Sequence, residues 1–108
     1  MRVKLSNNHE LIVRFRRENT FKKVAVYGPY NKKYSVLMFH GVMTTCYGMI
    51  GEDKVFEAST RHHEEDVFTK AEGRRRALNK ALSYSTLSKE NHTLIWDAYF
   101  IEHADLEK

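Results

Sequence analysis

The sequence has few of the residues that stabilise small secreted proteins, and it lacks long apolar runs. Its single cysteine, Cys46, cannot form a disulfide within the chain, so a reducing compartment is expected. One proline and five glycines form no linker-like stretch. No window approaches the roughly 18 apolar residues of a membrane span, and the start MRVKLSNNHE lacks the apolar core of a signal peptide. We therefore expect one soluble, intracellular domain over residues 1–108.

Common catalytic motifs are also missing. The chain has no G-x-S-x-G, no P-loop, no G-x-G-x-x-G, no H-E-x-x-H and no C-x-x-C. Cys46 falls within an apolar segment, where a buried thiol is expected rather than a nucleophile. The adjacent His62 and His63 would point to opposite sides of an extended backbone, so they do not predict a metal site. A non-enzymatic protein without metal or cofactor is the prediction.

Positive charge is concentrated near the N-terminus. Residues 1–33 carry nine Lys and Arg against two Glu, a net of +7, whereas residues 34–108 sum to −3. Such asymmetry suits an anionic partner, although a solvated face whose lysines only maintain solubility is the commoner explanation. Should the partner be nucleic acid, the basic residues that would contact it are Arg14, Arg16, Arg17, Lys22 and Lys23.

Alternating apolar and charged side chains predict strands in the first half of the chain. Leu11, Val13 and Phe15 are separated by single residues, which is the period of a half-buried strand. About five strands are expected: one around residues 11–16, one at 22–27, two within 34–50 and one at 55–61.

Glycine and proline place the turns and irregularities between these strands. The segments GPYNKK at residues 28–33 and GEDK at 51–54 predict hairpin turns. Residues 34–50 are apolar without clean alternation and predict more fully buried strands. Inside that stretch, Gly41 and Gly48 predict β-bulges.

A helical period begins after residue 66. Thr69 and Glu72 form a capping box, and Ser88 is placed to cap a second helix. The buried faces are expected to carry Leu78, Ala81, Leu82 and Ser85 in the first helix and Leu94, Ile95, Ala98, Tyr99 and Ile101 in the second.

Strands followed by helices predict an α+β domain. We expect an antiparallel β-sheet over residues 1–61, a helical hairpin packed on it over 67–102, and a frayed tail over 103–108. Such a sheet leaves edges and one face uncovered, which a homo-oligomer would cover.

Three arginines, Arg74 to Arg76, follow Gly73 near the start of the first predicted helix. Successive helical residues lie about 100° apart, so at most two of them can serve one site. Arginines near a helix start can meet a phosphate together with the free N–H groups there. They can equally form a solvated face. The register of Leu78 and Leu82 predicts Arg74 and Arg75 on or beside the packed side and Arg76 pointing away.

The order of motifs over residues 44–100 resembles small proteins of bacteriophages. TTC (44–46), a hairpin, F-x(4)-G-R-x-x-A-L-x-x-A-L (68–82) and W-x-x-Y (96–99) follow one another. Among such proteins, a sheet followed by two helices resembles the Thoeris anti-defence sponges. The resemblance implies a homo-oligomer in the host cytoplasm that sequesters a cyclic ADP-ribose signal without degrading it. It also implies that an aromatic side chain and arginines, here Phe68 and the Arg74 to Arg76 run, hold the nucleotide.

Two hypotheses follow. In the first, a phage counter-defence protein binds a small phosphorylated signal nucleotide at an oligomer interface, through Phe68, Arg74, Arg75, Arg61, His62 and Tyr99. In the second, a phage inhibitor binds a host protein, or binds nucleic acid through the basic N-terminal third.

Overall fold

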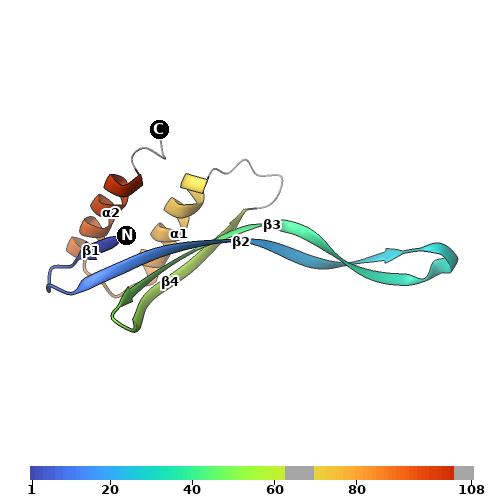
Figure 1. Ribbon diagram of the computed structural model, residues 1–108, viewed down its shortest axis with the longest axis horizontal. Helices are drawn as coiled ribbons and strands as arrows, with labels where there is room; N and C mark the ends of the chain where they lie inside the picture. Colours follow the sequence, from blue (N-terminus) through green and yellow to red (C-terminus); the bar gives the residue numbers. More distant parts are fainter. Residues whose placement is uncertain (63–69, 104–108) are drawn as a thin grey trace.

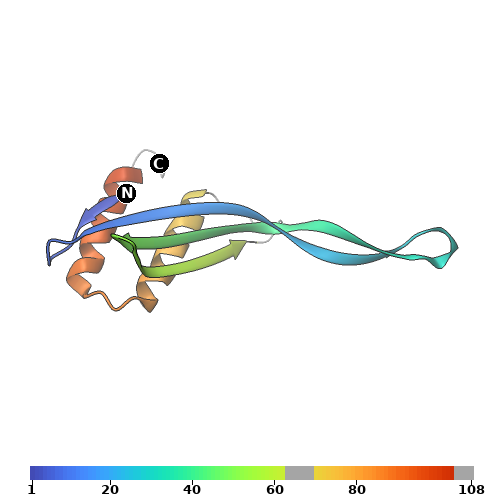
Figure 2. The same ribbon diagram turned by 60° about the horizontal axis from the view of Figure 1, so that its bottom comes forward.

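A computed structural model describes residues 1–62 and 70–103 of the chain. Its four strands form one antiparallel sheet in chain order, and both helices lie on the same face of it (Figures 1 and 2). The predicted α+β architecture, a sheet followed by two helices, is confirmed. The elements are β1 (Arg2–Lys4), β2 (Glu10–Tyr27), the short 3-10 helix η1 (Pro29–Asn31), β3 (Lys33–Ile50), β4 (Asp53–His62), α1 (Lys70–Tyr84) and α2 (Lys89–His103).

The sheet has four strands, close to the predicted five, but they are divided differently. The predicted strands at 11–16 and 22–27 are parts of one continuous strand, β2, and the two predicted within 34–50 are both β3. Each runs for 18 residues, and the two pair with each other over most of their lengths, from Ile12 with Met49 to Tyr27 with Lys33. β1 was not predicted, since three residues are too short for alternation to be recognised.

The strand register shifts beside both glycines for which bulges are predicted, although the extra residue at the second shift, Val55, lies on β4 rather than on β3. Beside Gly41, the pairing of β2 with β3 skips one residue, because Thr20 pairs with Gly41 and Phe21 with Phe39. Gly41 has φ 116°, a conformation that favours glycine. The pairing of β3 with β4 shifts directly after Gly48.

The core lies between the sheet and the two helices. α1 packs on β3 and β4, and α2 lies alongside β1. The largest fully buried side chains join both layers: Tyr99, Leu11, Leu78, Ile95, Val13, Thr45 and Cys46. Phe15 extends this core, with its ring edge-on to that of Tyr99 at 5.9 Å between centroids.

The helices agree with most of the predicted pattern. Leu78, Ala81 and Leu82 are buried. The Asn91 N–H donates to Ser88 Oγ at 3.3 Å, which is the predicted cap of α2. Ile101, expected on the buried face, is 81% exposed, because Ile95 and Tyr99 direct the opposite side of α2 to the core.

Some boundaries differ from prediction or cannot be compared. Thr69, the predicted cap of α1, lies outside the described residues, as do residues 104–108 of the predicted tail. α2 ends at His103, whose side chain is buried, so this residue belongs to the helix rather than to the tail. None of the described helices has the length and apolar content needed to cross a membrane.

Residues 20–41 form a two-stranded ribbon that projects beyond the helices, and we call it the arm (Figures 1 and 2). The molecule is 67 Å long, with a radius of gyration of 18.4 Å. A compact domain of about 100 residues has a radius of gyration of about 13 Å. The prediction that residues 34–50 are all buried is wrong for 34–39, which are exposed because neither α1 nor α2 lies over the arm (Figure 1).

Candidate functional site

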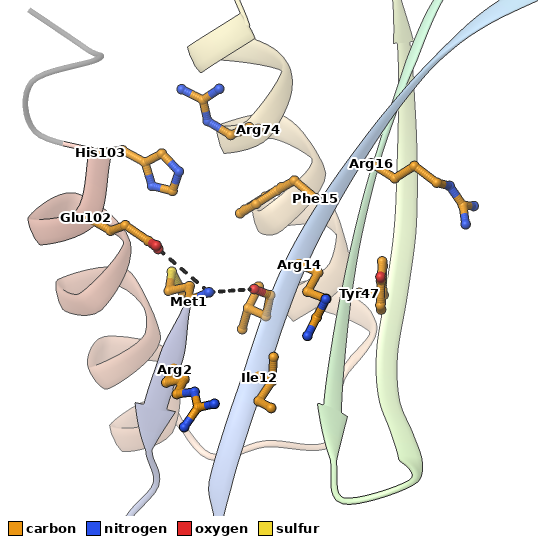
Figure 3. A pocket seen from close by; sticks show the side chains of 11 residues that line it. Met1, Arg2, Ile12, Arg14, Phe15, Arg16, Tyr47, Arg74, Glu102 and His103 are labelled. Carbon is orange, nitrogen blue, oxygen red and sulfur yellow. Dashed lines mark hydrogen bonds and ion pairs between the residues drawn. The ribbon is translucent and has the colours of Figure 1, made fainter.

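A hollow of about 550 Å³ lies along one edge of β2, near the N-terminus and the end of α2 (Figure 3). Residues from five elements and the chain start surround it. They are Met1, Arg2, Ile12, Val13, Arg14, Phe15, Arg16, Tyr47, Arg74, Glu102 and His103.

The hollow exists because β1 covers only the beginning of this edge. β1 pairs with Glu10–Ile12, and the Val13 N–H then donates to the Met1 carbonyl at 2.9 Å. Hydrogen-bonding groups of successive strand residues alternate between the two edges. The N–H and C=O of Phe15 therefore face the same edge as those of Val13, where β1 no longer pairs with the strand.

Alternation along β2 also divides the side chains around the hollow. Phe15 points to the helix side, where Arg74 and His103 lie (Figure 3). Arg14 and Arg16 project from the opposite face of the strand, beside Tyr47. A ligand that touched all of these groups would straddle the strand edge.

Arg74 has an unsatisfied group at this site. Its Nε is buried and makes no hydrogen bond with the residues that the structure describes. A guanidinium remains protonated in proteins, and a buried donor without a partner costs about 1–3 kcal/mol. Because this Nε is buried, a ligand in the hollow can reach only the remaining part of the half-buried Arg74 side chain, whose positive charge favours an anion there.

The charges around the hollow are mostly positive. Among the described residues, four arginines line it, against one carboxylate, Glu102, which lies 3.9 Å from the Met1 ammonium group. Arg2 pairs with Glu10 at 3.4 Å, and Arg16 pairs with Glu18. Arg14 and Arg74 form no ion pair with any of the described residues. These two cations are therefore the best placed to receive an anion.

His103 is held in place by its surroundings. Its ring stacks on that of Tyr99 with 4.5 Å between centroids, and Nδ1 lies 3.1 Å from the Tyr99 carbonyl, to which it can donate. The Phe15 ring meets it edge-on at 5.9 Å. Phe15 and His103 thus form a fixed wall beside Arg74.

The arginines of α1 do not converge on one site. A second hollow of about 380 Å³ is lined by Arg75 and Arg76 together with Glu72, Asn79 and Trp96. Arg74 is half-buried at the first hollow, whereas Arg75 is exposed at the second. Arg74 and Arg75, predicted to act together, therefore point into different hollows.

Of the other predicted ligand residues, those that the structure describes do not line the hollow of Arg74. Arg61 and His62 lie at the end of β4. Tyr99 is 0% exposed, so its ring packs in the core and offers no free face to a base. Phe68 lies outside the described residues.

The residues proposed for nucleic acid are spread over two faces. Arg14, Arg16 and Lys22 alternate onto the sheet face without helices, and Arg17 and Lys23 onto the other. On that open face, Lys54 donates to Glu57, and this hydrogen bond lowers the pKa of the Glu57 carboxyl below its usual range.

Sequence reasoning missed Phe15, His103 and the chain start as parts of one site. The sequence pattern predicts Phe15 as a strand residue and as one of the aromatic side chains that suit nucleic acid, and it places His103 in the tail. Phe15, His103 and the chain start come together only because of the way α2 packs against the sheet, and no local sequence pattern specifies that packing.

Chemically reactive groups elsewhere are few. Cys46 is fully buried, and burial raises the pKa of its thiol to about 12. Among residues 1–62 and 70–103, no three His, Cys, Asp or Glu side chains gather as a metal site would require. His63 and the acidic residues that follow it lie outside this part of the chain.

Comparison with protein-family models, with curated proteins and with solved structures finds no match to this chain.

Proposed function

We propose that the protein is a non-enzymatic binding protein that sequesters a small phosphorylated nucleotide of the cyclic ADP-ribose type. The observation that carries the proposal is a hollow lined by four arginines, among them the half-buried Arg74. The resemblance of residues 44–100 to phage sponges supports the same ligand class. On this proposal the protein is a phage-encoded counter-defence factor that acts as a homo-oligomer in the host cytoplasm.

The size and chemistry of the hollow suit such a ligand. Its volume of about 550 Å³ lies within the range of about 300–1,000 Å³ that is usual for small-molecule sites. Arg74 would bind a phosphate oxygen through its planar donors. The N–H and C=O of Phe15, which face the strand edge beyond β1, would meet the edge of a base or a ribose hydroxyl.

A binding role is favoured over catalysis by the groups at hand. His103 uses Nδ1 for the Tyr99 carbonyl and is fixed between two rings. The Cys46 thiol is buried in the core and is held protonated by its raised pKa. The side chains that line the hollow therefore bind and orient an anion, and none of them is an activated nucleophile.

Calorimetry with cyclic ADP-ribose isomers and cyclic oligonucleotides tests the proposal. We expect saturable binding of one of these nucleotides. Arg74→Ala removes a charge-assisted contact of about 1.5–3 kcal/mol, so the dissociation constant should rise about 10- to 150-fold. Arg75→Ala is the matched control, since it removes the same charge from the next residue, at the other hollow, and should change affinity less than about 3-fold.

Two outcomes would contradict the proposal. One is the absence of heat with every nucleotide at protein concentrations of tens of micromolar. The other is an equal loss of affinity in Arg74→Ala and Arg75→Ala, which would indicate general attraction of an anion to a basic helix rather than a site.

Nucleic acid is a second candidate, favoured by Arg14. This residue is exposed on the open sheet face, beside Arg16 and Tyr47, and has no carboxylate partner among the described residues. Cations and an aromatic ring on an open sheet are the groups that bind phosphates and unpaired bases.

Fluorescence anisotropy with labelled single-stranded and duplex oligonucleotides tests this candidate. Binding should weaken steeply with salt, and replacing Arg14, Arg16 and Arg17 with alanine should make the salt dependence shallower by about one unit of slope per lost contact. An unchanged slope in the triple variant would exclude this surface.

A further inference from the structure

The arm carries most of the exposed apolar surface of the molecule. Nine of the twelve large exposed hydrophobic residues within the described part of the chain belong to it. A free residue of this size exposes on the order of 200 Å². Their exposed fractions of 37% to 95% therefore leave about 1,000 Å² uncovered. They are Phe21, Val26, Tyr27, Tyr30, Tyr34, Val36, Leu37, Met38 and Phe39.

These side chains lie on both faces of the ribbon and at its tip, and about half of the exposed area belongs to the face that carries Phe21, Tyr27, Leu37 and Phe39. A contiguous patch of this size, about 500 Å², is as large as the largest apolar patch of a typical monomer, which is often a binding site. An isolated two-stranded hairpin is also only marginally stable. No helix or third strand covers the arm within the described residues (Figures 1 and 2). A partner that packs on the arm would account for both observations.

One face of the arm combines apolar and positive groups. Phe21 pairs with Phe39, and their rings lie edge-to-face at 6.3 Å between centroids. Directly along the ribbon, Lys23 pairs with Leu37, and near the tip Tyr27 pairs with Lys33. The arm contains four lysines and neither Asp nor Glu over residues 20–41. We call the side that carries these pairs the Phe21 face.

The outer face of α2 has the complementary character. Glu90, Thr93, Asp97, Phe100 and Ile101 recur at helical spacing and are all exposed, opposite the buried Ile95 and Tyr99. Phe100 is 50% and Ile101 81% exposed, and two carboxylates accompany them without a cation among these five residues.

We propose that two copies of the chain associate by exchanging arms, with the Phe21 face of each arm packed on the outer face of α2 of the other copy. Apolar side chains would then meet apolar side chains, and lysines would meet carboxylates. The arm strand Thr20–Tyr27 is about 26 Å long, and α2 is about 22 Å long. Two copies lying side by side in opposite directions satisfy both contacts at once, as a twofold-symmetric dimer requires.

A second copy is preferred over another partner because one chain supplies both complementary surfaces. The inference does not rest on the proposed nucleotide, since association is measured without any ligand. Loss of nucleotide binding and loss of dimerisation are therefore separate results.

Charge reversal across the interface provides the test. In the arm variant, Lys23→Glu and Lys33→Glu place carboxylates against those of α2. In the helix variant, Glu90→Lys and Asp97→Lys place lysines against those of the arm. Sedimentation velocity over a range of concentrations should give a dimer for the unchanged chain. For each variant alone, the dissociation constant of the dimer should be at least about 30-fold higher.

An equimolar mixture of the two variants should associate again. In the mixed dimer, the acidic arm meets the basic helix and the basic arm meets the acidic helix, so both contacts are complementary. Its dissociation constant should return to within about 5-fold of the original value. The control variant Glu52→Lys with Asp53→Lys changes the charge equally at the exposed β3–β4 turn and should dimerise normally. Circular dichroism checks that every variant is folded.

Four results would overturn the inference. They are a monomeric unchanged chain at about 0.1 mM, a mixture that associates no better than its components, a folded variant that dimerises like the unchanged chain, and equal weakening in the control. If the unchanged chain is a monomer and the arm variant loses affinity for duplex oligonucleotides, the arm is a nucleic-acid element instead.

Discussion

Gly48 is where a single added carbon should disturb the core most directly. It lies opposite Phe56 in the pairing of β3 with β4, and the Phe56 ring packs over it. A Cβ at this position would lie 2.5, 2.7 and 2.9 Å from three ring atoms. Ordinary carbon contacts are about 3.5–4.0 Å, so in Gly48→Ala the ring would have to move by about 1 Å.

The ring has little room to move, because Phe56 is only 5% exposed. Overpacking of this kind costs about 1–3 kcal/mol. In a domain of about this size, 1 kcal/mol lowers the melting temperature by about 4–8 °C, so Gly48→Ala should melt at least about 5 °C lower.

Thermal and urea unfolding, followed by circular dichroism at one protein concentration, measure the effect. Phe56→Leu replaces the obstructing ring with a smaller side chain. The double variant, Gly48→Ala with Phe56→Leu, should therefore be at least about 1 kcal/mol more stable than the sum of the single effects predicts. An unchanged melting temperature in Gly48→Ala, or strict additivity, would refute the packing argument.

Three further predictions concern the α2 anchor and the thiol. In Asn91→Ala, the Ser6 N–H loses its acceptor, Asn91 Oδ1 at 2.9 Å. The free energy of unfolding, measured in urea, should fall by about 1–2 kcal/mol, and an unchanged urea midpoint would show that this hydrogen bond does not stabilise the fold. Ser88→Ala removes the α2 cap and should cost about 0.5–2 kcal/mol in the same assay, whereas no cost would show that the cap contributes nothing. Cys46 should resist maleimide at pH 8 in the folded protein and react fully in guanidinium, because burial raises its pKa to about 12; rapid labelling of the native state would contradict its placement.

Local patterns were sufficient to predict the architecture. Alternation at Leu11, Val13 and Phe15 identified the central strand, and the period of Leu78 and Leu82 identified the buried side of α1. Each pattern arises because one strand or helix turns one side toward the core. Both patterns can therefore be recognised from the local sequence alone.

The arm could not be predicted in this way. Both of its faces carry apolar side chains, and residues 34–39 resemble a strand covered on two sides. Whether helices reach such a ribbon depends on where the helices pack. The helices end before the ribbon, and the same residues are therefore exposed.

The candidate site could be predicted in part. A helix start rich in arginine was recognised, and geometry limited how many could act together. Which arginine meets Phe15 and His103 depends on the placement of α1 against α2. Arg74 holds that position, and Arg75 points to the second hollow.

Mass spectrometry of small molecules retained by the purified protein tests the central claim most directly. The protein would be purified from cells with an active nucleotide-signalling defence, alongside Arg74→Ala and Arg75→Ala. The account predicts a phosphorylated nucleotide, released by denaturation, in the unchanged chain and in Arg75→Ala, and its loss in Arg74→Ala. No retained nucleotide in the unchanged chain, or equal retention in Arg74→Ala, would contradict the account.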